Sequence, residues 1–499
     1  MERIDLEQET IVSLAAGMRG GGLSARGLTE HCLARIEALD PKVNAVIEAN
    51  PDALCIADEL DRERDEGRLR GPLHGLPILI KDNLDTADGM MTTAGSLAME
   101  GFHARKDSFV VARLRQAGAV LLGKTNLSEW ANYRSTRSSS GWSSRGGQTR
   151  NPHALDRTPG GSSSGSAVAV AAGMCVAAIG TETDGSIVGP SSINGVVGVK
   201  PTVGLVGRTG IIPVSHSQDT AGPMARSVAD AAVLLAAISG MDADDPITGA
   251  ASAHAAALQG MALEDGALGQ ARIGVARNYC GYHDMADALF DRALADLESR
   301  GAIVIDDLEL PPADEIRPGE RLVMSTEFKV GLARYFSRHA PQAPFRTLAD
   351  VIRCNEAHAD SIMPWFRQEL FEEAEATEGL SDSRYLEALK RCRRLTREEG
   401  IDRLMEENRL DAIVAPTTGP AWLIDWIGGD NRAGGCALLA AVAGYPHVSV
   451  PMGRVHGLPV GLSFFGRAWS EVRLLNLAYD YERHFPRRVA PGFGDTLVL

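Results

Sequence analysis

The sequence predicts an α/β protein whose core is a mixed β-sheet surrounded by helices. The first observation is a short apolar run at residues 76–83, LPILIKDN, bounded by Pro77 and Asn83. An apolar run of this length without polar alternation is typical of a strand buried on both faces, as in a parallel sheet. Lys81 stands at the C-terminal end of this predicted strand.

Two strand-helix-strand patterns are the second and third observations. A helix is predicted from Asp107 or Ser108, either of which can cap it, to Gly118, and the residues AVLLG follow as a strand. Farther along, RIGVA at 272–276 precedes an amphipathic helix that ends at Gly301, and AIVIDDLEL resumes the strand pattern. Alternation of this kind favours a largely parallel or mixed sheet covered by helices.

The composition is that of a globular protein with a large core, because 44% of the 499 residues are hydrophobic and 23% are charged. The formal net charge of −15 creates a field that repels a polyanion. The arginines between residues 62 and 70 are interleaved with acidic residues, which is typical of a solvated helix face. We therefore predict no nucleic-acid partner.

The sequence gives no signal for export or for a membrane. Residues 1–18 contain acids and amphipathic spacing instead of a basic start and an apolar stretch, and the longest apolar run, at 167–179, is interrupted by Gly173. The seven cysteines are scattered without metal-binding spacing, as expected for free thiols in a reducing compartment. These observations predict a cytoplasmic protein without membrane association.

Two short motifs point to other enzymes but stand in the wrong context. Residues 118–125 match the phosphate-binding pattern G-x4-G-K-T, yet residues 119–122 are apolar and belong to a strand rather than to a flexible loop. Residues 161–165 match the nucleophile elbow G-x-S-x-G with Ser163 as the nucleophile. An elbow follows a strand, whereas the preceding residues DRTPG form a turn. Both interpretations are therefore disfavoured.

A third set of residues has a coherent chemical interpretation. Lys81 at the end of a buried strand could act as a base, because burial lowers the pKa of a lysine. A Gly-Gly-Ser-Ser turn at 160–163 and an Asp-Gly-Ser-Ile sequence at 184–187 supply hydroxyl groups that such a base could activate. Gly185 leaves the backbone free to direct several N–H groups at one point, as an oxyanion hole requires. Taken one by one, these residues are also compatible with ordinary turns and a surface lysine.

The combination resembles the amidase-signature hydrolases. The resemblance runs from about residue 71 to 245 and resumes near the C-terminus, in the segments GPLHGLPILIKDN, GKTNLSEWAN, TRNPHALDRTPGGSSSGSAVAVAAG, GTETDGSI, GVVGVKPTVGL, SQDTAGPMARSVAD, AGYPHVSVPMG and GLPVGLSFFGR. These segments are long and stand in the order of the family. The resemblance implies the amidase-signature fold and hydrolysis of a carboxamide C–N bond through an acyl-enzyme, with no metal and no organic cofactor.

The resemblance also implies roles for individual residues. It makes Lys81 the base, Ser162 the relay serine that follows a cis peptide bond, and Ser186 the nucleophile. A cis bond before a residue other than proline costs about 3 kcal/mol, so the Gly-rich turn around Ser162 would have to enforce it.

The resemblance further implies an oxyanion hole, made of the N–H groups of Thr183, Asp184, Gly185 and Ser186. The sequence departs from the commonest family pattern at Ser164, Glu182, Asp184 and Val188. Asp184 stands where many members have glycine. A carboxylate beside an oxyanion hole opposes the developing charge unless its side chain turns away, so this departure matters most.

The TETDGSI variant, together with SQDTAGPMARS and EFKVGLARYF, is similar to the branch that contains bacterial peptide amidases, which remove the C-terminal amide of peptides. We therefore expect a peptide amide or another small-molecule amide as the ligand, and a monomer or homodimer as the assembly. The alternatives are an amidase for aryl or aliphatic amides, an inactive binding protein, or an amidotransferase A-type subunit. Retention of Lys81, Ser162 and Ser186 argues against the inactive protein.

Four parts are predicted within one continuous catalytic domain. Residues 1–70 form an N-terminal helical cover, and residues 71–311 form the catalytic amidase-signature core. Residues 312–408 are charged, lack strand signals and form a helical insertion or cap. Residues 409–499 return to the core.

Overall fold

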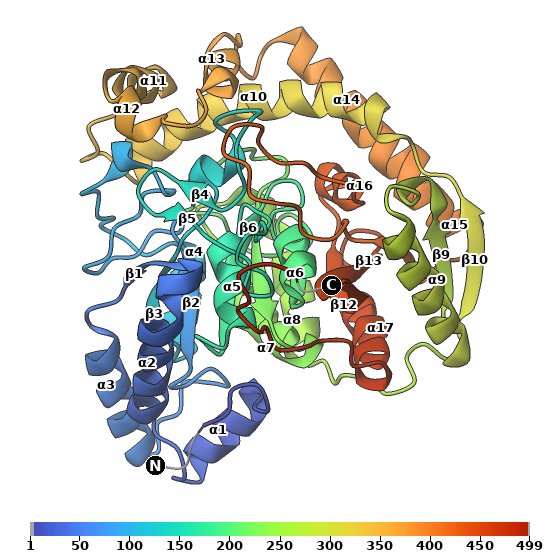
Figure 1. Cartoon of the computed structure of the whole chain (residues 1–499), viewed down its shortest axis with the longest axis horizontal. Helices are drawn as coiled ribbons and strands as arrows, with labels where there is room; N and C mark the ends of the chain where they lie inside the picture. The colour runs from blue at the N-terminus through green and yellow to red at the C-terminus, as the bar shows by residue number, and fades with distance from the viewer. Residues whose placement is uncertain (1–3, 498–499) are drawn as a thin grey trace.

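A single mixed sheet of 11 strands forms the centre of the molecule, and helices surround it (Figure 1). The computed structural model describes residues 4–497. Residues 1–3 and 498–499, the outer ends of the predicted N-terminal cover and of the C-terminal return, lie outside the described residues. The architecture confirms the predicted α/β class with a mixed sheet.

The sheet combines two parallel regions with an antiparallel middle. The strands lie in the order β1 (Val46–Ala49), β3 (Val120–Thr125), β2 (Pro77–Lys81), β6 (Ala177–Glu182), β8 (Thr220–Ala225), β7 (Val197–Lys200), β12 (His447–Val455), β13 (Leu458–Phe465), β11 (Ala412–Pro416), β9 (Arg272–Ala276) and β10 (Ile303–Leu308). β2 is parallel to β3 and β6, and β9 is parallel to β10 and β11, whereas the other neighbours are antiparallel. A separate hairpin pairs β4 (Trp142–Ser143) with β5 (Gly147–Gln148).

The helices cover both faces and the upper edge of the sheet (Figure 1). They are α1 (Ile11–Arg19), α2 (Ala25–Val43), α3 (Ala53–Asp65), α4 (Phe109–Gln116), α5 (Ser164–Ala171), α6 (Val188–Asn194), α7 (Val228–Ile238), α8 (Ala251–Gln259), α9 (Asp284–Ser299), α10 (Ala313–Arg338), α11 (Leu348–Ala357), α12 (Ala359–Ile362), α13 (Glu369–Glu375), α14 (Ser383–Thr396), α15 (Asp402–Glu407), α16 (Ala437–Ala443) and α17 (Glu471–His484). Of the two predicted caps of α4, Ser108 is the one used, because its hydroxyl accepts a hydrogen bond from the N–H of Val111.

The N-terminal segment contains a strand as well as helices. β1 pairs with β3 in antiparallel fashion at the edge of the sheet, between α2 and α3. The helical pattern of residues 1–70 did not predict this strand. Its four residues are only partly buried or exposed, so they lack the alternation of apolar and polar residues that marks a half-buried strand in a sequence.

The segment 312–408 is helical and is tied to the rest of the chain by two kinds of contact. In Figure 1, α10 and α14 run along the top of the molecule. Phe328 and Phe336 of α10 share a hydrophobic cluster with Trp130 and Tyr133. The buried carboxylate of Glu327 accepts hydrogen bonds from the hydroxyls of serines 215 and 217 and of tyrosine 385. Apolar packing and a buried polar network therefore hold α10 against the core.

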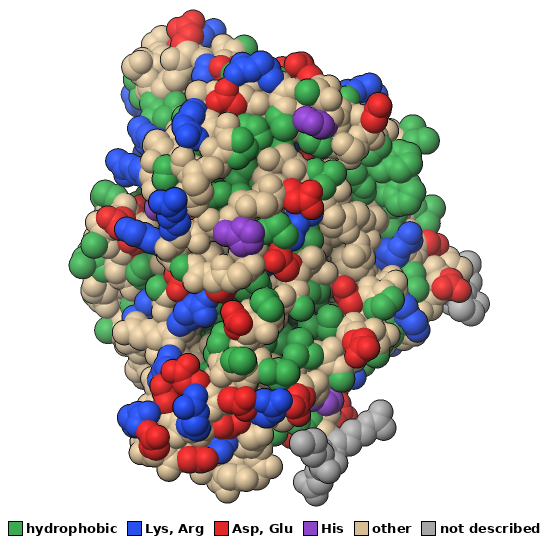
Figure 2. Space-filling view, turned by 90° about the vertical axis from the view of Figure 1, so that its left-hand side faces the viewer, with side chains coloured by type: hydrophobic (Ala, Val, Ile, Leu, Met, Phe, Trp, Pro, Cys, Tyr) green, Lys and Arg blue, Asp and Glu red, His purple; other side chains and the backbone are tan. Residues whose placement is uncertain are grey.

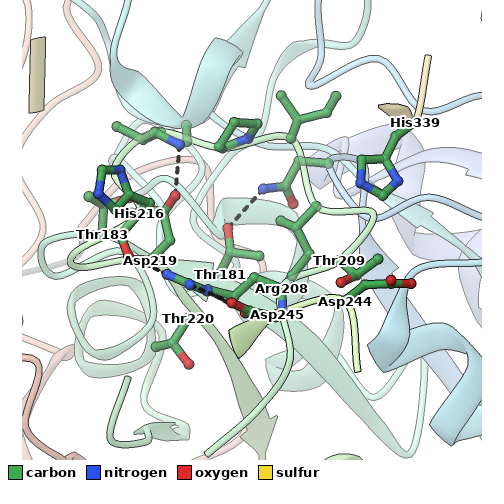
Figure 3. A pocket seen from close by; sticks show the side chains of 16 residues that line it. Thr181, Thr183, Arg208, Thr209, His216, Asp219, Thr220, Asp244, Asp245 and His339 are labelled. Atoms are coloured by element: carbon green, nitrogen blue, oxygen red, sulfur yellow. Dashed lines mark hydrogen bonds and ion pairs between the residues drawn. The ribbon is translucent and has the colours of Figure 1, made fainter. Parts of the chain in front are cut away.

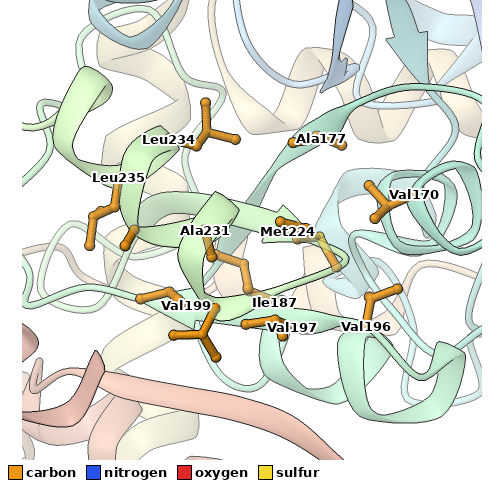
Figure 4. Packing of buried hydrophobic residues seen from close by; sticks show 14 of the residues in the cluster. Val170, Ala177, Ile187, Val196, Val197, Val199, Met224, Ala231, Leu234 and Leu235 are labelled. Atoms are coloured by element: carbon orange, nitrogen blue, oxygen red, sulfur yellow. The ribbon is translucent and has the colours of Figure 1, made fainter. Parts of the chain in front are cut away.

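The main hydrophobic core lies between the sheet and the helices that cover it. Figure 4 shows Val197 and Val199 of β7 beside Ala231 of α7, with Ile187 in the same cluster. Ile187 directly follows Ser186 in the chain and is fully buried. Burial of this side chain helps to fix the position of the preceding loop.

The surface and the helices give two further observations. On the face shown in Figure 2, Lys and Arg side chains lie among Asp and Glu side chains, and no extended basic surface is present on that face. Among residues 4–497, no helix combines the length and the apolar character needed to cross a bilayer.

The close approach of α5 to its neighbours yields a stability prediction. A Cβ at Gly165 would lie 2.2 Å from the carbonyl oxygen of Ala45 and 2.6 Å from that of Asn126, whereas a Cβ at Gly189 of α6 would meet nothing within 4 Å. We expect Gly165→Ala to lower the free energy of unfolding by about 3 kcal/mol because backbone must move. Gly189→Ala should leave it unchanged or raise it by up to about 1 kcal/mol. Urea unfolding followed by circular dichroism measures both, and equal stabilities would contradict the prediction.

Candidate active site

Lys81 ends β2, and its side chain is completely buried. Its Nζ lies 2.7 Å from the Oγ of Ser162, 3.1 Å from the Oγ of Ser163 and 2.9 Å from the Oγ1 of Thr181. All of these partners are uncharged, and within residues 4–497 no carboxylate forms an ion pair with Nζ. Burial lowers the pKa of Lys81 to about 7, while the more distant charges of Glu182 and Asp219 oppose that shift. A substantial fraction of the amine is therefore neutral near pH 7.

Ser162 and Ser163 lie in the turn that precedes α5. The peptide bond between Gly161 and Ser162 is cis, as the family resemblance implied. The hydroxyl of Ser163 donates to the carbonyl oxygen of Thr181 at 3.0 Å and accepts from the N–H of Thr181 at 3.1 Å. No strand leads into Ser163, and its side chain is fully buried and engaged. The nucleophile-elbow interpretation therefore lacks both its geometry and an accessible hydroxyl.

Ser186 lies in the loop between β6 and α6. Because β6 is parallel to β2 and adjacent to it, the carboxyl ends of the two strands lie at the same edge of the sheet. This places the loop beside Lys81, and the carbonyl oxygen of Ser186 accepts a hydrogen bond from the N–H of Ser163 at 3.1 Å. Ser186 is 8% exposed, and its hydroxyl does not hydrogen-bond to that of Ser162 in this structure.

The backbone around Ser186 offers several unused donors. Within the described part of the chain, the N–H groups of residues 183–186 donate to no protein acceptor. Gly185 has a φ of 77°, a conformation that favours glycine. After the loop, the Oε2 of Glu182 accepts from the N–H of Ile187 at 2.7 Å and of Val188 at 3.0 Å. Glu182 thus fixes the start of α6 while the preceding N–H groups stay available to an anion.

The loop 183–186 runs between two cavities. Asp184 and Gly185, which precede the predicted nucleophile Ser186, line a cavity of about 220 Å³. We call it the nucleophile cavity after that prediction. Gly161, Trp422, Arg317 and Arg432 also line it.

Thr181 and Thr183 line a second cavity, of about 170 Å³ (Figure 3). In Figure 3, Asp219 points toward Thr183, and its carboxylate accepts a hydrogen bond of 2.6 Å from the Thr183 hydroxyl. Burial raises the pKa of Asp219 to about 6.

The side-chain amide of Gln218 links helix α10 to the predicted oxyanion loop. The Nε2 of Gln218 donates to the carbonyl oxygen of Thr183 at 3.2 Å and to the Oε1 of Glu320 at 3.1 Å. Burial and the nearby charge of Asp184 raise the pKa of Glu320 to about 8. Gln218 falls in the motif SQDTAGPMARS, but Glu320, Arg317 and Arg432 lie in segments where no motif marks them.

The nucleotide-binding pattern at residues 118–125 does not form a site either. Lys124 of the nucleotide-binding pattern is fully buried in β3, and its Nζ donates to the carbonyl oxygen of Leu84 and to the hydroxyl of Thr92. It cannot reach a phosphate.

Among residues 4–497, ligand atoms of Asp265, Asp480 and His484 lie within 4.8 Å of one another. The side chain of Arg300 pairs with both of these aspartates, and Arg483 pairs with Asp265. Because guanidinium groups already neutralise these carboxylates, we assign the group no metal role.

Comparisons with known proteins identify the family of the chain. The family model described as Amidase matches residues 27–475. The native peptide amidase from Stenotrophomonas maltophilia is 52% identical with a TM-score of 0.92, over 97% of this chain and 99% of that one. A peptide amidase in complex with the competitive inhibitor chymostatin gives a TM-score of 0.93 at 52% identity, over 97% of this chain and 99% of that one.

Curated relatives extend the comparison to other members. A probable amidase from Arabidopsis thaliana is 40% identical over 98% of this chain and 92% of the relative. The A-type subunit of the glutamyl-tRNA(Gln) amidotransferase from Pseudomonas syringae is 35% identical over 96% of this chain and 98% of the relative. These matches confirm the resemblance seen in the sequence. The chain belongs to the amidase family and is an amide-hydrolysing enzyme with the amidase-signature fold.

Proposed function

We propose that this enzyme removes the C-terminal amide of peptides, with Ser186 as the nucleophile and Ser162 and Lys81 as its proton relay. The observation that carries the relay is the 2.7 Å contact between the buried Nζ of Lys81 and the Oγ of Ser162, with no carboxylate of residues 4–497 paired to the amine. A lysine in this environment is a base near neutral pH. The loop that bears Ser186 lies at the same edge of the sheet, with free N–H groups beside the hydroxyl.

The acylation step uses the neutral amine of Lys81. Lys81 takes the proton of the Ser162 hydroxyl, and Ser162 takes that of Ser186 as the Ser186 oxygen bonds to the amide carbon. The electron pair of the carbonyl moves onto its oxygen, which the N–H groups of residues 183–186 stabilise. Catalytic hydrogen bonds often tighten only when substrate is bound, so an open Ser162–Ser186 contact in the free enzyme is compatible with this step.

The relay then runs in reverse. Collapse of the tetrahedral intermediate breaks the C–N bond, and the amine takes the proton stored on Lys81 through Ser162 and leaves as ammonia. Water attacks the acyl-enzyme and gives one proton to the relay. The carboxylic acid leaves when the Ser186 oxygen recovers that proton. No step in this sequence consumes a further reactant.

Two observations support a peptide as the acyl group. The peptide amidase of Stenotrophomonas maltophilia is 52% identical to this chain along nearly its whole length. The nucleophile cavity also lies between Gly185 and residues of α10 and of the loop 417–436, Arg317 and Trp422 among them. A cavity of about 220 Å³ bounded on these sides accepts a residue-sized group next to the scissile carbonyl.

The relay assignment predicts distinct effects for four alanine variants. Ser186→Ala should abolish turnover because the nucleophile is lost. Lys81→Ala and Ser162→Ala should each lower kcat by about 10²–10⁴-fold, the range for a positioned acid-base group. Ser163→Ala, which removes a hydroxyl held by Thr181, should cost far less. Steady-state ammonia release measures all four, and an active Ser186→Ala beside an inactive Ser163→Ala would overturn the assignment.

The pKa of Lys81 predicts the pH profile. Because the protonated amine cannot act as the base, kcat/KM should rise through a pH of about 7 and level off above it. Asp219→Asn should move this rise in kcat/KM to lower pH, since the Asp219 charge raises the Lys81 pKa. Asp360→Asn, a change on an exposed residue of α12, serves as the control. If kcat/KM rises at the same pH in Asp219→Asn and in the wild type, a group other than Lys81 is titrating.

The substrate assignment predicts an exo mode of cleavage. If the enzyme removes only terminal amides, a peptide amide should change by conversion of its terminal NH2 to OH, with one equivalent of ammonia and intact internal bonds. Mass spectrometry of the reaction resolves these products. Internal fragments, or turnover of aryl and aliphatic amides without turnover of the peptide amide, would reject the peptide substrate and leave the amide-hydrolysing activity.

A further inference from the structure

The nucleophile cavity carries an unusual set of charges. Arg317 comes from α10 and Arg432 from the loop 417–436, so two segments more than a hundred residues apart each contribute an arginine to its lining. Asp184, two residues before Ser186, also lines it. The lining therefore includes one acidic and two basic residues.

These charged groups have little or no bonding to the protein. Within residues 4–497, the side chains of Arg317 and Asp184 form no hydrogen bond and no ion pair within 4 Å. Arg432 has a single long contact, 3.7 Å from the Oδ2 of Asp430, and its side chain is 52% exposed. Asp430 already accepts hydrogen bonds from Ser140 and from the indole of Trp422. The charges of Arg317 and Arg432 act on the Asp184 carboxylate from a longer distance, where both oppose the rise of its pKa that burial causes, but neither guanidinium group forms a close ion pair with it.

The negative net charge of the whole chain affects how an anionic group can approach this cavity. At a net charge of −15, the protein as a whole repels anions, so an anionic group approaches the site only if a local positive charge outweighs that field. Arg317 and Arg432 supply such a charge, and the single carboxylate of Asp184 offsets only part of it. A guanidinium group presents a planar fork of donors that fits a carboxylate, and it stays protonated at every physiological pH.

The position of the cavity shows which part of the substrate would meet the arginines. This step rests on the proposed function, in which the leaving group is ammonia. Ammonia is too small to fill a cavity of about 220 Å³. Any larger group in the cavity therefore belongs to the acyl part of the substrate, next to the scissile carbonyl.

We propose that Arg317 and Arg432 bind a carboxylate on the acyl part of the substrate, so that the enzyme prefers carboxamides whose acyl residue is acidic. A peptide ending in glutamic acid amide is the simplest such substrate. Asp184 limits this preference, because its carboxylate repels the same group. The two arginines and Asp184 are thus specificity-determining residues of one subsite.

The binding test uses Ser186→Ala as the background, so that it does not depend on turnover. Two ligands are compared by calorimetry, Ala-Ala-Glu-NH2 and the uncharged Ala-Ala-Met-NH2 of similar size. The glutamic acid amide should bind about tenfold more tightly, as expected for a charge-assisted hydrogen bond. Adding Arg317→Gln or Arg432→Gln should reduce this ratio several-fold, and the corresponding lysine variants should retain part of it. Adding Asp184→Asn should increase it.

A matched arginine serves as the control. Arg353→Gln removes a guanidinium whose side chain is 67% exposed on α11 and does not line the cavity, so the ratio should stay unchanged. If the Arg317 and Arg432 variants bind both ligands more weakly by the same factor, the proposal is overturned. The arginines would then bind the peptide backbone that both ligands share, or act only as counter-ions of Asp184. A wild-type preference for the methionine amide would overturn it as well.

The test separates this inference from the proposed function. If the active enzyme releases no ammonia from either peptide amide but the binding ratio behaves as expected, the peptide amidase assignment fails and the carboxylate subsite stands. If both peptides are deamidated with equal kcat/KM and bind equally, the subsite fails and the assignment stands.

Discussion

The burial of an unpaired lysine amine at the end of β2 is the constraint on which the rest of the site depends. The side chain of Lys81 is completely buried, with its amine against the turn that precedes α5 and against Thr181 of β6. Burying an ammonium ion without a counter-ion is costly, and the amine is therefore neutral at a pH where other lysines are charged. Its hydrogen bonds must come from uncharged groups, and Thr181 of the next strand and the two serines of the turn before α5 supply them.

Close packing of backbone explains why the helix that follows Ser162 has a glycine in its first turn. Gly165 brings α5 into contact with the backbone of Ala45 and Asn126, and the N–H of Gly165 donates to the carbonyl oxygen of Asn126. Contact with the N-terminal segment thus helps to hold the helix that follows Ser162 in place. On the other side of the site, Glu182 fixes the start of α6 after Ser186. The two serines therefore each precede a short helix, α5 or α6, that contacts with other segments hold in place.

Helix α10 adds charged side chains to this site. Through Gln218 it contacts the carbonyl oxygen of Thr183, and it places the buried carboxyl group of Glu320 close enough to Asp184 for the charge of one to raise the pKa of the other. It also contributes Arg317 to the cavity. Helix α10 is thus part of the candidate site, and the core sequence motifs say nothing about that contribution.

The sequence by itself determined the fold class, the family and the candidate residues Lys81, Ser162 and Ser186, because these lie in strands and turns whose local patterns are strong. An apolar run that ends in lysine, and glycine-serine turns next to an apolar helix, can be recognised without any long-range contact. Only the tertiary structure decided that Ser163 is held by Thr181, that β1 joins the sheet edge, that Arg317 and Arg432 line the cavity, and that Glu320 contacts Gln218. These features arise from contacts between segments far apart in the chain. A local sequence pattern does not predict which arginine or acidic residue of a distant segment will lie next to the site.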